Sequence, residues 1–88
     1  MLKLKIKYFL SPEGALSFPA WYDEVYQAVS RQDGFVKMRY EREGNNFVVY
    51  LSFTKQEKLD LWASTDTHDE LVAKIETHFM KPEEVEQL

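Results

Sequence analysis

The sequence predicts an α+β domain of the ferredoxin-like (split βαβ) class, with its elements in the order β-α-β-β-α-α. Three patterns lead to this class. Residues 2–10 alternate between apolar and charged side chains, apolar and aromatic residues recur at helical spacing over 18–29, and two more alternating stretches flank 44–46. The C-terminal residues are only weakly patterned, so the fourth strand usual in this class is expected to be missing or reduced.

The first predicted strand, residues 2–10, ends at Ser11-Pro12. Its even-numbered residues are apolar or aromatic, whereas lysines occupy most odd positions, as in a strand with one buried face. The helix that follows starts at Pro12 or at Pro19, because proline suits a first helical turn. Gly34 lies where a left-handed residue would end that helix.

Two strands, residues 35–43 and 46–53, are predicted to form a hairpin around Gly44-Asn45-Asn46. A two-residue loop, at 44–45 or 45–46, places all the apolar residues of both strands on one face. Those residues are Val36, Met38, Tyr40, Phe47, Val49, Leu51 and Phe53. A three-residue loop without a bulge would place charged residues opposite them, so the two-residue loop is expected.

Two capping-box patterns predict the remaining helices. Thr54 and Glu57 open a short helix that runs through Trp62, and Thr67 and Glu70 open the last one. The last helix is expected to end at Pro82, and its inward residues are Leu71, Val72, Ile75 and Phe79. Residues 1–80 are thus predicted to form one domain. Residues 81–88 form an acidic tail, expected to pack in extended form along the sheet edge or across a partner.

Composition limits the function classes. Apolar residues make up 44% of the 88 residues and charged residues 30%, and no apolar run reaches the roughly 18 residues of a spanning helix. The absence of Cys excludes disulfides, thiolate metal sites and cysteine nucleophiles. The two His residues lack metal-ligand spacing, so no metal site is predicted. A net charge of -4 argues against a general polyanion binder, and a cytoplasmic protein is expected.

The face of the sheet that points away from the helices combines cations with aromatic residues. Its members are Lys3, Lys5, Lys7, Phe9, Phe35, Lys37, Arg39, Glu41, Val48, Tyr50 and Ser52. Lysine stems could simply cover aromatic edges on a solvated face. Alternatively, single-stranded nucleic acid could stack there, as on an RNA recognition motif. A third interpretation is a homodimer through this face, with the tail carboxylates Glu83, Glu84 and Glu86 opposite the cations; the acidic net charge favours it over nucleic acid.

Residues 53–68, FTKQEKLDLWASTDTH, resemble antibiotic biosynthesis monooxygenases. In that family an aromatic residue ends the third strand, and a capped helix with a Trp is followed by a small-residue turn and a His. Phe18 and Trp21 in the first helix, and Gly34-Phe35 at the start of the second strand, are also similar to that family.

The resemblance implies a dimeric α+β barrel, in which two protomers pack their sheets together and each keeps a small pocket between its helices and its sheet. It also implies oxygenase chemistry without a metal, flavin or other cofactor, on a small electron-rich aromatic or quinol. Haem-degrading relatives use an Asn on the first strand and a His farther from the Trp. This chain has no such Asn, and His68 lies six residues after Trp62, so haem degradation is not expected.

Candidate site residues are those predicted to face the space between helices and sheet. The catalytic candidates, as proton acceptors or hydrogen-bond donors, are His68, Tyr8 and Tyr40. The substrate-binding candidates are Trp62, Trp21, Tyr22, Tyr26 and Met38. Every Tyr and Trp among them carries an O–H or N–H that needs a partner when buried, which favours a pocket over a dry core.

Structural interpretations of the same residues stay open. Trp62 could be a core side chain that closes one end of the sheet, and His68, at the first position of the last helix, could only support the turn after Trp62. His78, in the last turn of that helix, needs no function. The chain is therefore expected to be a cofactor-independent monooxygenase-like protein that acts on a small aromatic. The alternative is a non-catalytic dimeric module that binds a small ligand.

Overall fold

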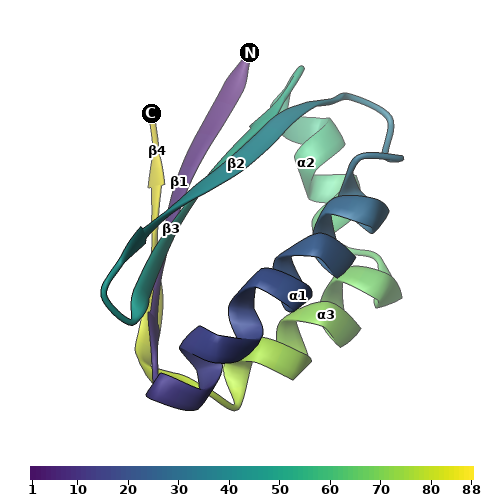
Figure 1. Cartoon of the computed structure of the whole chain (residues 1–88). Coiled ribbons are helices and arrows are strands. Elements are labelled where there is room, and N and C mark those ends of the chain that lie inside the picture. Colours follow the sequence, from purple (N-terminus) through teal and green to yellow (C-terminus); the bar gives the residue numbers. More distant parts are fainter.

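A computed structural model describes residues 1–88 as one antiparallel four-stranded sheet with three helices on one of its faces (Figure 1). The strand order is β2-β3-β1-β4. The elements are β1 (Leu2–Leu10), α1 (Pro12–Val29), β2 (Phe35–Glu43), β3 (Asn46–Phe53), α2 (Gln56–Ala63), α3 (Asp66–Glu76) and β4 (Phe79–Gln87). The α+β ferredoxin-like class is confirmed.

The fourth strand is present, so the expectation that it is missing or reduced is wrong. β4 spans nine residues and pairs antiparallel with β1, on the edge of β1 that is opposite β3. It begins at Phe79, because α3 ends at Glu76 rather than at Pro82. β4 contains Pro82, which an edge strand tolerates because only one of its sides is hydrogen-bonded to a neighbour. The β1–β4 register shifts between Lys7 and Phe9, which is where Pro82 lies. The tail beyond residue 80 therefore runs along the sheet edge.

The helix boundaries differ from the capping patterns. α1 starts at Pro12, where Ser11 is the N-cap and its hydroxyl accepts from the Gly14 N–H. Pro19 lies inside this helix. Helix α2 begins after Lys55, because the backbone N–H of Thr54 still extends the β2–β3 ladder by donating to the Gly34 carbonyl.

Gly34 does not end α1, whose last residue is Val29, but occupies the left-handed region just before β2. Its φ is +88°, and an added Cβ would lie 2.6 Å from the Cβ of Lys58. Both the conformation and the close approach of α2 therefore require glycine here.

The β2–β3 hairpin has the expected two-residue loop, Gly44-Asn45, because Glu43 pairs with Asn46. A bulge near the start of β2 changes one detail. Phe35 pairs with Phe53, whereas Lys37 already pairs with Ser52, so Val36 is the extra residue. One extra residue inverts the faces of a strand. Phe35 therefore packs on the helix side rather than on the outer face, and Val36 is exposed.

The core lies between the inner face of the sheet and the helices, and consists of two clusters. One joins α1 to the first half of β3, with Phe18 stacked on Phe47 at 4.0 Å between ring centroids. The second includes Val29, Leu51, Phe53, Trp62 and Leu71. The helices are also held together by a buried hydrogen bond of 2.7 Å from the Trp21 indole N–H to the Leu71 carbonyl.

The outer face keeps the predicted cations and gains carboxylates from β4. Lys5 lies opposite Glu86 and Lys7 opposite Glu84 in the β1–β4 pairing. The guanidinium carbon of Arg39 lies 4.1 Å from the centre of the Tyr50 ring. Two of the carboxylates expected to come from a partner are thus on the same face of the same chain.

None of the three helices combines the length and the hydropathy that a membrane crossing requires. The cytoplasmic location stays a prediction.

Candidate functional site

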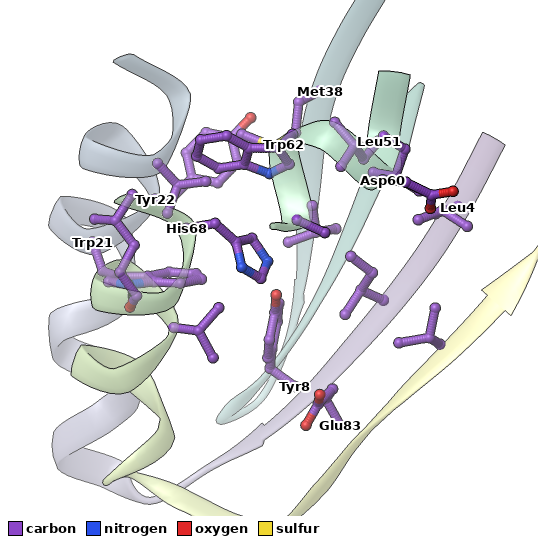
Figure 2. Close-up of a pocket in the computed structure, with 18 of the residues that line it drawn as sticks. Leu4, Tyr8, Trp21, Tyr22, Met38, Leu51, Asp60, Trp62, His68 and Glu83 are labelled. Atoms are coloured by element: carbon purple, nitrogen blue, oxygen red, sulfur yellow. Dashed lines mark hydrogen bonds between the residues drawn. The ribbon is translucent and has the colours of Figure 1, made fainter. Parts of the chain in front are cut away.

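A cavity of about 270 Å³ lies between the helices and the inner face of the sheet (Figure 2). β1, β2 and β3 form one wall, α1 and α3 the opposite wall, and α2 and β4 contribute further lining residues. Of its 19 lining residues, 16 are hydrophobic. A small apolar space with few polar groups is the usual form of a small-molecule site.

Local structure explains why His68 reaches this cavity. Thr65 is the N-cap of α3, and its hydroxyl accepts from the backbone N–H of His68 at 3.1 Å. The same hydroxyl donates to the Trp62 carbonyl at 2.8 Å, which ties the end of α2 to the start of α3. His68 is therefore the third residue of α3, not the first, and its ring meets the Trp62 ring edge-on with centroids 5.5 Å apart.

The imidazole of His68 also has a polar contact, with Asp69, outside the cavity. Its Nδ1 lies 3.1 Å from a carboxylate oxygen of Asp69, and the side chain is 30% exposed. We assign the proton of the neutral ring to Nδ1, which donates to Asp69, so Nε2 is left as a hydrogen-bond acceptor. Figure 2 shows the His68 ring and the Tyr8 hydroxyl directed toward each other within the cavity.

Tyr8 rises from β1 into the middle of the cavity, with its ring edge against Trp21. Part of the side chain is accessible, but protein surrounds the hydroxyl. Burial, and secondly the negative charge of Glu83, raise the pKa of Tyr8 well above its ordinary value. The hydroxyl is thus held neutral, as a hydrogen-bond donor or acceptor rather than a base.

Six of the eight predicted site residues line the cavity: Tyr8, Trp21, Tyr22, Met38, Trp62 and His68. The other two do not. Tyr40 packs edge-on against Phe18 and Tyr22, and β3 separates its strand from that of Tyr8. Tyr26 is 39% exposed and contacts Tyr22 and Phe35 at the surface of α1.

Two predicted roles change with these contacts. The indole N–H of Trp21 is already bonded to the Leu71 carbonyl, so it offers no polar group to a ligand. His78 lies beyond the end of α3, where its backbone carbonyl accepts from the Ser11 N–H and its Cβ faces Gly14. It is therefore not in the last turn of a helix.

Sequence patterns missed two carboxylates of the cavity, Asp60 and Glu83. Glu83 lies on β4, a strand whose alternation is too weak to detect, and Asp60 follows Leu59 on a helix whose polar residues all suggest a solvated face.

The cavity contains no lysine or arginine. No group of three or more His, Asp or Glu side chains converges anywhere in the fold.

No protein-family model and no curated protein matches this sequence. Solved structures do match it. An antibiotic biosynthesis monooxygenase crystal structure superposes with a TM-score of 0.90 at 20% identity, covering 100% of this chain and 96% of that one. Rv0793 from Mycobacterium tuberculosis gives 0.88 at 15% identity, covering 99% and 91%.

A mutant of SnoaB, a cofactor-independent oxygenase from Streptomyces nogalater, gives a TM-score of 0.87 at 14% identity, covering 99% of this chain and 89% of that one. At these identities the superpositions compare backbones, not active-site chemistry. This chain has the ferredoxin-like α+β fold of the antibiotic biosynthesis monooxygenases.

Proposed function

We propose that the protein binds a small hydroxylated aromatic molecule, such as a quinol, in the cavity between helices and sheet, and oxidises it with dioxygen without a cofactor. One observation carries the proposal: His68 and Tyr8 face each other inside a space that is otherwise almost entirely apolar. A cavity of about 150 Å³ suffices for benzene, so about 270 Å³ suits one substituted ring or two fused rings.

His68 and Tyr8 have different roles in the proposed reaction. Nε2 of His68 accepts the proton of the substrate hydroxyl, and Asp69, bonded to Nδ1, stabilises the imidazolium that results. The neutral Tyr8 hydroxyl donates a hydrogen bond to a second oxygen of the ring. Trp62 and Tyr22 exclude water from the deprotonated ring.

The electrons come from the substrate itself. The deprotonated quinol passes one electron to dioxygen, and the superoxide and semiquinone combine at a ring carbon to form a hydroperoxide. Loss of water then yields a hydroxyquinone, so one oxygen atom enters the ring and the other leaves as water. No external reductant is needed, which agrees with the description of SnoaB as a cofactor-independent oxygenase.

Oxygen consumption with a panel of hydroquinones tests this reaction. We expect His68→Ala to lower the rate by about a hundredfold or more, the usual contribution of a positioned base. His78→Ala is the matched control, because that His lies outside the cavity and Ala keeps the Cβ that faces Gly14. Equal rates for the native protein and His68→Ala would reject the assignment of His68 as the base.

A second candidate is a non-catalytic module that binds the same ligands. The cavity raises the pKa of the phenol it already contains, Tyr8, and this opposes the ionisation that a reaction with dioxygen needs. Saturable binding of hydroquinones without any oxygen consumption supports this candidate over the oxygenase.

The proposal includes a homodimer through the outer face of the sheet. Tyr50 and Phe9 are covered there by cations, with Lys81 Nζ 4.0 Å from the Phe9 ring centre, and lysines and carboxylates alternate across β1 and β4. A self-complementary charge pattern of this kind suits a two-fold interface. A monomer in sedimentation, together with salt-sensitive binding of a single-stranded oligonucleotide, would instead support nucleic-acid binding by this face.

A further inference from the structure

The formal charges that line the cavity are all negative. Asp60 comes from α2 and Glu83 from β4, whereas no lysine or arginine lines the space. Neither carboxylate takes part in an ion pair of the chain. Asp60 only accepts a hydrogen bond of 2.8 Å from the side-chain amide of Gln56, which leaves its charge in place. The one cavity group able to become positive, His68, already lies against the carboxylate of Asp69.

Glu83 lies exposed at the edge of the cavity, and its charge acts on Tyr8, where it contributes to the raised pKa of the phenol. In Figure 2 its carboxylate lies at the base of the Tyr8 ring, whose hydroxyl faces His68. The two neighbours of Glu83 on β4 behave differently: Pro82 carries no charge, and Glu84 lies opposite Lys7, 4.0 Å from Lys81. Glu83 is therefore the carboxylate of this strand that acts on the cavity rather than on the outer face.

The pKa of Tyr8 shows how this environment affects a phenol. Burial and the Glu83 charge both favour its neutral form, and they raise the pKa of its hydroxyl. A ligand in the same space is subject to the same two effects. An anionic group on the ligand loses its hydration and gains no cation in return, whereas a neutral hydroxyl does not meet this cost.

We infer that Asp60 and Glu83 make the cavity selective for uncharged or cationic hydroxyaromatic ligands and reject carboxylated ones. The inference rests on the proposed function, and deepens it by stating the charge of the substrate. It also agrees with the proposed proton transfer, because a neutral phenol that passes its proton to His68 leaves the total charge of the cavity unchanged.

Three para-substituted phenols test the selectivity at pH 7: phloretic acid, which is an anion, its isosteric amide phloretamide, which is neutral, and tyramine, which is a cation. Binding is followed by the NMR shift of the Trp62 indole N–H. We expect the native protein to bind phloretamide at least about tenfold more tightly than phloretic acid, and tyramine at least as tightly as phloretamide.

The double variant Asp60→Asn, Glu83→Gln should bind phloretic acid about as tightly as phloretamide, with little change for phloretamide. Glu84→Gln is the matched control: it removes a neighbouring carboxylate on the outer face and should keep the native preference. Circular dichroism checks that each variant is folded.

Equal binding of acid and amide by the native protein overturns the inference, as does a preference that survives in the double variant. The proposed function fails separately. If the amide binds but no hydroquinone of the panel consumes oxygen, the oxygenase is rejected and the charge selectivity still stands. If none of the three phenols binds, both the aromatic site and the selectivity are rejected.

Discussion

Tyr8 and His68 occupy the same cavity but meet different surroundings. The hydroxyl of Tyr8 is buried inside the cavity, whereas the ring of His68 is partly exposed and keeps a carboxylate partner in Asp69. The cavity thus contains one group held neutral and one group that can take up a proton with its charge compensated. Such a division between neighbouring groups is what acid–base chemistry at a site requires.

The raised pKa of Tyr8 has a consequence for stability. In the unfolded chain Tyr8 ionises near its ordinary pKa of about 10, but in the folded protein it stays neutral to a higher pH. The stabilisation is fully present below pH 10 and is lost as the pH rises above that value toward the folded pKa. We expect the urea midpoint to fall between about pH 10 and pH 11.

Tyr8→Phe should reduce this fall, since phenylalanine cannot ionise. Tyr26→Phe serves as the control, because Tyr26 is exposed and lies outside the cavity. A loss of stability above pH 10 that is equal in Tyr8→Phe and in the native protein would contradict the assignment to Tyr8.

At the scale of elements, the α2–α3 junction positions the site. Thr65 both caps α3 and bonds the last turn of α2, and through these contacts it sets Trp62 against His68. The sequence pattern instead suggests Thr67 as the cap, but that residue lies inside α3. Two threonines two residues apart cannot both be the N-cap, and the packing of Trp62 into the core decides between them.

Substitution of each threonine distinguishes the two caps. Thr65→Ala should lower the free energy of unfolding by about 1 kcal/mol, the usual value for loss of an N-cap side chain. Thr67→Ala should change it by no more than about 0.5 kcal/mol, because Thr67 is exposed. Urea denaturation measures both, and an equal loss in the two variants would contradict the observed cap.

β2 and β4 mark the limit of pattern analysis in this chain. The two-residue loop, which the structure has, follows from the alternation of its flanking strands, because a three-residue loop without a bulge would place charged residues opposite the apolar ones. The bulge at Val36 and the strand β4 do not follow from alternation. A bulge depends on contacts with the neighbouring strand, and a charged edge strand is stabilised by its hydrogen bonds to β1 rather than by burial of its own side chains.

At the scale of the whole molecule, the helices cover only the inner face of the sheet (Figure 1). The outer face remains open to solvent or to a second copy, and Tyr50 lies on its central strand pair. The cavity and this face are on opposite sides of the sheet. Association through the outer face would therefore leave the cavity of each protomer separate.

Tyr50→Asp tests the homodimer directly. A carboxylate in the middle of a packed interface should shift the protein to monomers in sedimentation velocity, with a loss of at least tenfold in association constant, about 1.4 kcal/mol. Tyr26→Asp places the same change on the exposed side of α1 and should leave association unchanged. A sedimentation coefficient that is the same for Tyr50→Asp and the native protein would contradict an interface at this face.

The sequence by itself determined the fold class, the two-residue hairpin loop and most of the aromatic side chains between helices and sheet, because each depends on local periodicity and on which residues must leave water. Tertiary structure alone decided which of those side chains line the cavity. β3 lies between the strands of Tyr8 and Tyr40, and β4 brings Glu83 beside Tyr8 from the far end of the chain. Strand order and edge pairing bring together residues that are distant in sequence. The spacing of residues within one segment does not predict either, because both depend on contacts between segments.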